Sequence, residues 1–236
     1  MNKLNTVFLM SLFVLLQMAV AADADDRYPP LVKEAFDNMA RDDSVDWTCL
    51  VTTTETKKTR VERCDYRDGD CEWQLLTENG EPPSDKQLGK YREEKDELKA
   101  NENKKENNRF ERLATPGSVK LLQEDSTTAR YAFAPRPESE DDKKVLEKMD
   151  GSLVVNKSGP FVASFEMTNT DTLKVAPLVK LHVMRVSMNF APLQKGGPYF
   201  PELQHSVVEG KIGGLKKIRQ NTRVAFSDCA LLDDQD

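Results

Sequence analysis

Apolar and polar residues alternate with a period of two along much of the chain, which predicts a mainly β protein. The clearest example begins at Trp47, where Trp47, Cys49 and Val51 alternate with threonines and a leucine, so we expect a strand over 46–56. Further strand-like runs lie at 58–64, 73–76, 119–123, 129–134, 153–156, 161–167, 179–190, 204–212 and 222–226. Turn residues separate nearly all of these runs, which predicts antiparallel pairing of successive strands.

Three stretches depart from this alternation and predict helices. Apolar residues recur at helical spacing over 29–41, which indicates a short amphipathic helix that starts at two prolines. A capping box at Ser84 predicts a second helix, in a charged insertion that spans about 84–112. A third, brief helix is expected over 139–149, with Asp150-Gly151 ending it.

The long run over 179–190 changes character along its length. Strict alternation places on one face Lys180, His182, Met184, Val186, Met188 and Phe190. It places on the other face Val179, Leu181, Val183, Arg185, Ser187 and Asn189. Each face is polar at one end and apolar at the other, which fits a curved sheet. We therefore predict an α+β protein, mainly antiparallel β, with a curved half-barrel sheet, an N-terminal helix and one or two inserted helices.

The N-terminus has the pattern of a cleaved export signal. A weakly basic start with Lys3, an apolar run over 7–20 and the small residues of Ala19-Val20-Ala21 match what signal peptidase accepts. The apolar run is too short to fill a hydrocarbon core that needs roughly 20 apolar residues. We therefore expect residues 1–22 to be removed, and residues 23–236 to form one exported, soluble domain that does not span the membrane.

The charge balance excludes some classes of partner. The chain has 34 Lys and Arg residues against 40 Asp and Glu, a net charge of −6 that becomes −7 when Lys3 leaves with the signal. Nucleic-acid binding needs protein cations to neutralise phosphates, so we expect no nucleic-acid partner. The acidic balance also gives no general attraction to anionic membranes.

Four cysteines in an oxidising compartment predict disulfides. Of the three possible connectivities, we favour Cys64 with Cys71, because the turn signal Asp68-Gly69 between them brings their flanking segments together. Cys49 then pairs with Cys229 and ties an early strand to the last one. The spacing does not fit a zinc site, which leaves free or redox-active thiols as the alternative.

Several segments resemble uncharacterised exported proteins of Gram-negative bacteria that are similar to the LolA-like periplasmic lipoprotein carriers. The resemblance is carried by Trp73-Gln74-Leu75-Leu76, Asn79-Gly80-Glu81-Pro82-Pro83-Ser84, Tyr91-Arg92, Leu153-Val154-Val155-Asn156, Pro160-Phe161-Val162 and Val224-Ala225-Phe226-Ser227. It implies a periplasmic protein with a concave apolar sheet face, covered by helices, that shelters a lipid or an acyl chain.

Bulky apolar residues on two strands are the best candidates to line such a cavity. They are Phe161, Phe165, Met167, Met184, Met188 and Phe190. Methionine is flexible and suits adaptable lipid sites, but it also fills ordinary cores. The pattern therefore leaves both a cavity and a filled core open.

Signatures of catalysis are sparse. The sequence contains neither Gly-x-Ser-x-Gly nor His-Glu-x-x-His, and no phosphate-binding glycine loop. His182 and His205 are expected to be structural or exposed, and the aspartates at 65, 68 and 70 lack the spacing of a calcium loop. We therefore expect no catalytic residue, cofactor or metal.

Three functions remain as hypotheses. The first is a non-enzymatic periplasmic protein that binds a lipid or acyl chain in its concave sheet. The second is an envelope interaction or sensor module, with a sheet filled by its own side chains and a charged helix that meets a protein partner. The third is a hydrolase with dispersed catalytic residues, since triads can assemble from distant positions.

Overall fold

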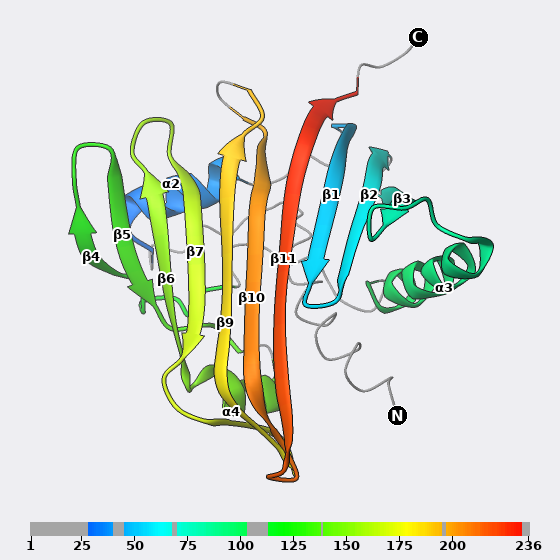
Figure 1. The fold of residues 1–236 in the computed structure, drawn as a ribbon. Helices are drawn as coiled ribbons and strands as arrows, with labels where there is room; N and C mark the ends of the chain where they lie inside the picture. The colour runs from blue at the N-terminus through cyan, green and yellow to red at the C-terminus, as the bar shows by residue number, and fades with distance from the viewer. Residues whose placement is uncertain are drawn as a thin grey trace.

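A single antiparallel sheet organises the protein (Figure 1). The computed structural model describes residues 28–39, 45–67, 70–102, 113–137, 139–194 and 197–232, so the predicted export signal and the Asp68-Gly69 turn lie outside the described residues. The 11-stranded sheet has the order β3-β2-β1-β11-β10-β9-β7-β6-β5-β4, and β8 pairs separately with β9. Its strands are β1 (Trp47–Glu55), β2 (Lys58–Arg67), β3 (Asp70–Glu78), β4 (Lys120–Glu124), β5 (Thr128–Phe133), β6 (Met149–Asn156), β7 (Phe161–Asn169), β8 (Leu173–Ala176), β9 (Val179–Pro192), β10 (Tyr199–Ile212) and β11 (Lys216–Leu231).

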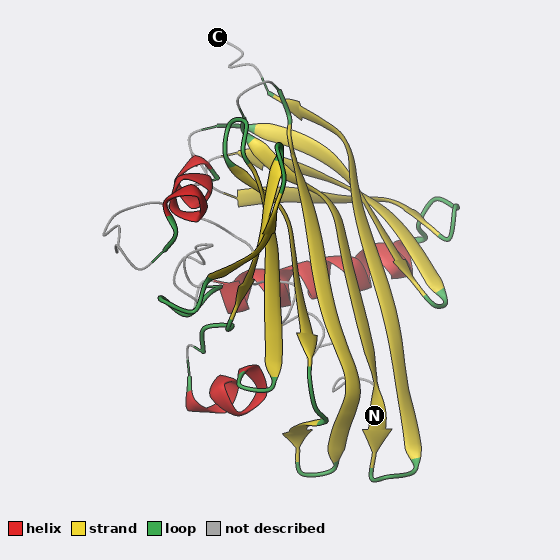
Figure 2. Cartoon of the chain, turned by 90° about the vertical axis from the view of Figure 1, so that its left-hand side faces the viewer, coloured by secondary structure: helices red, strands yellow, loops and turns green. Residues whose placement is uncertain are grey.

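Helices α2 (Pro30–Asn38), α3 (Asp85–Glu102) and α4 (Glu140–Leu146) accompany the sheet. α2 contacts β6 and β7, α3 contacts β3, and α4 contacts β6 and β8. In Figure 2, α2 and α4 lie on the same side of the strands. The predicted class, mainly antiparallel β with an N-terminal helix and inserted helices, is confirmed. The sheet is open and uncurled, so it does not close into the predicted curved half-barrel. Within the described ranges, no helix is long and apolar enough to cross a bilayer.

The prediction of strict alternation along β9 is wrong at one position. His182 is an extra residue between Leu181 and Val183, a β-bulge that brings Leu181 onto the face of Met184. The opposing strand carries Gly210, where an added Cβ would lie 2.2 Å from a backbone carbonyl oxygen of β9. Only glycine permits this close approach, so the apparent mixture of polar and apolar residues on each face comes from the bulge.

The expected helix over 139–149 is too long. α4 ends at Leu146, and Met149 already begins β6, so Asp150-Gly151 does not end the helix. Gly151 lies inside β6, where a Cβ would meet the Phe133 ring at 2.3 Å, so the glycine makes room for that ring. The short strand β8 was not predicted from the sequence.

Both favoured disulfides are present. Cys49 is bonded to Cys229 and Cys64 to Cys71, and the chain has no free cysteine. The first bond joins β1 to β11, and the second closes the β2–β3 hairpin. Both fit an oxidising compartment.

Candidate functional site on the inner face of the sheet

The face of the sheet that α2 covers, here called the inner face, changes chemistry from one edge to the other. One row of directly paired residues shows this change across the sheet. From β4 to β3, it runs through Leu121, Tyr131, Leu153, Phe165, Met188, Gln204, Val224, Thr53, Arg60 and Glu78. Along this row the inner face is therefore apolar over β4–β9, mixed over β10, β11 and β1, and charged over β2 and β3. Farther along β1 and β2, the same face carries a second buried apolar cluster that includes Trp47, Cys49, Val51, Cys64 and Tyr66.

The apolar part is packed beneath α2. This helix buries Val32, Ala35 and Phe36, and Met39 is buried just beyond its end. Contacts outside the helix fix its two ends: Tyr28 Oη donates to the Ala114 carbonyl (2.9 Å), Asn38 Nδ2 donates to the Pro160 carbonyl (2.8 Å) and the Val162 amide donates to Met39 Sδ (3.0 Å). α2 has only 9 residues and no side-chain cap, so apolar packing rather than intrinsic helix stability holds it in place.

All of the predicted cavity residues meet in this apolar part. Phe161, Phe165, Met167, Met184, Met188 and Phe190 belong to one buried cluster that includes the α2 side chains. None of these residues is more than 9% exposed. Phe165 and Phe190 lie with ring centroids 6.2 Å apart, and Phe161 stacks on Tyr199 at 4.6 Å. With α2 in place, these side chains pack as a core.

A strip of polar residues borders the apolar part. Gln204, Ser206 and Thr222 are each no more than 6% exposed, and Ser206 pairs directly with Thr222 across β10 and β11. In the described part of the chain, their side chains make no hydrogen bond. None of their polar atoms is among the fully buried side-chain atoms that lack a partner in the described structure, so the strip presents polar groups beside the apolar part.

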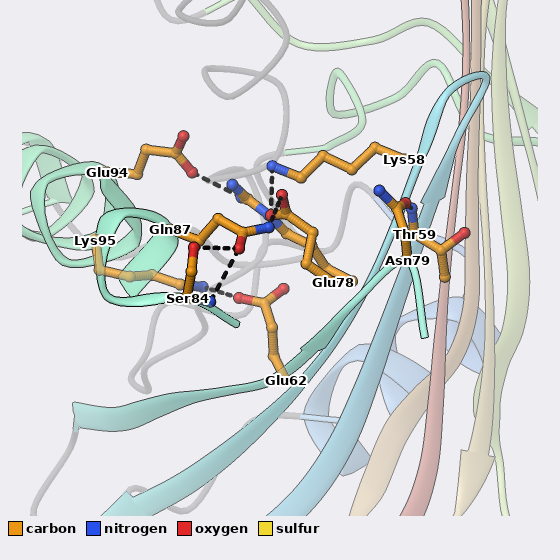
Figure 3. Close-up of polar contacts among 10 residues, drawn as sticks. Lys58, Thr59, Glu62, Glu78, Asn79, Ser84, Gln87, Glu94 and Lys95 are labelled. Carbon is orange, nitrogen blue, oxygen red and sulfur yellow. Dashed lines mark hydrogen bonds and ion pairs between the residues drawn. The ribbon is translucent and has the colours of Figure 1, made fainter. Parts of the chain in front are cut away.

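The charged end of the inner face anchors α3 (Figure 3). Arg60 bonds Glu78 through Nε (3.1 Å) and Glu94 through Nη1 (2.6 Å). Lys95 Nζ lies 2.8 Å from Glu62 Oε1. Figure 3 shows the α3 residues and the hairpin residues pointing toward one another, so these ion pairs join the helix to β2, and through Arg60 to Glu78 of β3.

The predicted capping box is formed in part. Gln87 Oε1 accepts from the Ser84 backbone N–H at 2.9 Å and from the Ser84 hydroxyl at 2.6 Å. Gln87 Nε2 also donates to Glu78, so the cap is connected to the ion-pair network. The start of α3 is therefore fixed to the end of β3.

Two aromatic rings enclose the ammonium group of Lys95. Its Nζ lies 3.5 Å from the centroid of the Trp73 ring and 5.2 Å from that of Tyr91, a cation–π arrangement. Burial lowers the pKa of Lys95, against the opposing effect of the Glu62 charge. Burial and the Glu62 charge both raise the pKa of the Tyr91 hydroxyl, which makes no hydrogen bond of normal geometry in the described structure.

Glu78 gives the network a pH dependence. Its burial raises the pKa, but hydrogen bonds from Lys58, Gln87 and Arg60 outweigh burial and lower the pKa to about 2. In the unfolded chain the pKa returns to about 4.5, so the carboxylate stabilises the fold at neutral pH. This contribution is about 3 kcal/mol, and it is lost as the pH falls from about 4.5 through 2.

Replacing Glu78 by glutamine is therefore expected to lower the free energy of unfolding by about 3 kcal/mol at neutral pH and by progressively less toward pH 2. Urea unfolding at several pH values measures both effects. Glu81→Gln, an exposed position close by, is the matched control and should show little effect at any pH. If the loss of unfolding free energy in Glu78→Gln stays constant on acidification, the pKa argument is contradicted.

The outer face of the sheet holds both histidines but no deep site among the described residues. An open depression of about 320 Å³ is lined by Ser187, Asn189, Leu203, His205 and Arg223. His205 Nε2 bonds Asn221 Oδ1 at 2.8 Å, whereas His182 lies in the bulge, 3.4 Å from Thr172 Oγ1. The structure does not bring the two histidines into one catalytic arrangement.

Sequence reasoning missed the ion-pair network around α3. The signal was present, because Lys58, Arg60 and Glu62 alternate on one face of a strand and Tyr91 and Lys95 share one face of a helix. Each pattern alone is typical of a solvated surface. Only the fold brings the two surfaces together and buries them.

Comparison of the chain with family models, with curated proteins and with solved structures finds no match. The functional argument therefore depends on the geometry of the inner face.

Proposed function

We propose that this protein is a non-enzymatic periplasmic carrier or receptor for an amphiphilic lipid. The row of residues across the inner face supports this proposal, because it passes from apolar through polar to charged side chains. An acyl chain fits the apolar part, and a lipid headgroup fits the strip of Gln204, Ser206 and Thr222. The LolA-like resemblance points to the same class of ligand.

Entry of a ligand requires α2 to move, because the helix fills the apolar part. The binding-competent state is then the one with α2 displaced, and the apparent affinity is reduced by its fractional population. The short, uncapped α2 is suited to local opening, which costs less than global unfolding.

Phe36→Ala tests this mechanism directly. The substitution removes the largest buried side chain of α2, so the open state becomes more populated and a fluorescent long-chain fatty acid should bind roughly tenfold more tightly. Glu34→Ala, on the exposed side of α2, should leave binding unchanged. Equal affinity of Phe36→Ala and the wild type, or binding by neither, would contradict the proposal.

The polar strip has its own test. Thr222→Val removes a hydroxyl at nearly constant volume, so binding of a phospholipid should weaken while binding of the fatty-acid probe should not. Ser187→Val on the outer face is the matched control. Equal loss for both ligands would mean that the strip supports packing rather than headgroup recognition.

A filled sheet with a protein partner is the second candidate function. It is favoured by the dense packing of the apolar part and by the fixed position of α3. The outward side of α3 exposes charged residues that include Lys86, Lys90, Arg92 and Asp96. A photocrosslink from Arg92 to an envelope protein, lost when Lys90 and Asp96 are reversed in charge and accompanied by no bound lipid, would favour this function over the carrier.

A further inference from the structure

Two hairpin tips project together from one end of the sheet. The turn between β8 and β9 contains Leu178, and the turn between β10 and β11 contains Leu215. Both tips lie at the lower end of the sheet in Figures 1 and 2. The Gly213 amide donates to the Leu178 carbonyl at 2.8 Å, so the tips are neighbours.

The leucines at these tips point into solvent. Leu178 is 67% exposed and Leu215 is 92% exposed. A single exposed leucine is ordinary, but two on adjacent tips form a small apolar patch at this end of the sheet. This patch is separate from the inner face.

Behind the tips, four lysines form a row across four neighbouring strands. The pairing is direct at each step: Lys174 with Lys180, Lys180 with Lys211, and Lys211 with Lys217. All four are exposed, and Lys216 adds a fifth lysine beside the Leu215 turn. Like charges directly opposite on paired strands destabilise a sheet, so this row is costly in an isolated protein.

Acidic residues do not compensate this charge. The segments 174–180 and 210–219 contain no Asp or Glu, although the chain as a whole has a net charge of −6. The flanking Asp171 pairs with Lys148, and Glu209 pairs with Arg219. Within the described structure, the four lysines of the row have no carboxylate within ion-pair distance.

We propose that these two tips dock on the surface of an anionic lipid bilayer. Lys180, Lys211 and Lys217 lie two residues from the turns, about 7 Å along a strand, so their ammonium groups reach the phosphate layer when the leucines enter the interface. The combination of apolar tips with a basic row distinguishes a membrane surface from a soluble polyanion, which needs only the charges. This inference does not depend on ligand binding at the inner face.

Sedimentation of the mature protein with vesicles tests the proposal. The protein should bind vesicles that contain phosphatidylglycerol and not vesicles of phosphatidylcholine alone, and salt should weaken binding. Lys180→Gln with Lys211→Gln should lower the partition coefficient about 30-fold, because each lysine near an anionic surface contributes about fivefold. Leu178→Ser with Leu215→Ser should lower it at least tenfold, an order-of-magnitude expectation from the lost apolar burial.

Matched variants guard against general effects. Lys86→Gln with Lys90→Gln on α3, and Leu122→Ser on β4, change exposed residues elsewhere and should leave vesicle binding unchanged. The lysine-row variant should also unfold at the same or a higher temperature, since it relieves repulsion. Vesicle binding that survives loss of both tip leucines, absence of vesicle binding, or tighter binding to duplex DNA than to vesicles would each overturn the proposal.

Discussion

Replacing Cys49 and Cys229 together by alanine is expected to lower the free energy of unfolding by about 5 kcal/mol, the largest loss that we anticipate for any single structural feature. The bond spans a sequence separation of 180 and joins β1 to β11, the third and fourth strands counted from the β3 edge. In the loop-entropy description, a cross-link that closes so long a loop restricts the unfolded chain strongly. Urea unfolding of the oxidised wild type and the double variant measures the difference. The free energy of unfolding of the variant should also fall more steeply with urea concentration, because its unfolded chain is less restricted and exposes more surface.

The second disulfide supplies the matched control. Cys64 and Cys71 are only 7 residues apart, so the loop that their bond closes is much shorter. Replacing both by alanine removes the same atoms but releases only this short loop. The same description gives a loss of about 2 kcal/mol for this pair. Equal losses for the two double variants would show that local packing, rather than loop closure, accounts for the stabilisation.

Replacing Lys95 by methionine is expected to destabilise the protein by about 3–5 kcal/mol. The substitution keeps the length of the side chain but leaves Glu62, whose side chain is only 8% exposed, without its cation. An unpaired buried carboxylate is costly, whereas an apolar pair of similar volume is not. The double variant Lys95→Met with Glu62→Met should therefore recover most of the loss.

Chemical denaturation of the two single variants and the double variant measures this coupling. Lys90→Met, on the exposed side of the same helix, should change stability by no more than about 0.5 kcal/mol. The account of α3 fails if Lys95→Met lowers the free energy of unfolding no more than Lys90→Met does. It also fails if the double variant is as unstable as the sum of the single variants.

Much of the sheet could be predicted from the sequence because its signals are local. Alternation within each strand identified most strands, and the disulfide pairs followed from one turn signal and from elimination. Gly151 and Gly210 show where local reasoning fails. Each is a glycine because a Cβ would collide with a neighbouring strand or ring, a cause that lies on a partner segment and leaves no mark in the flanking sequence.

The candidate site was predictable to a similar extent. The six bulky residues on β7 and β9 meet as expected because strand faces follow from alternation. The polar strip lies on the β10–β11 hairpin, and the network around α3 joins β2, β3 and the helix that follows them. Both depend on which residues are paired between elements, which alternation within one strand does not show. The lysine row depends on register in the same way, since its members lie on the four consecutive strands β8, β9, β10 and β11.

The central claim is that the inner face of the sheet shelters a lipid when α2 moves aside. Native mass spectrometry of the protein, purified gently from its native source, tests this claim most directly. The account predicts a population of protein with two intact disulfides and the added mass of one lipid, which disappears after extraction with organic solvent. A single species at the mass of the bare chain, unchanged after incubation with envelope lipids, would contradict it.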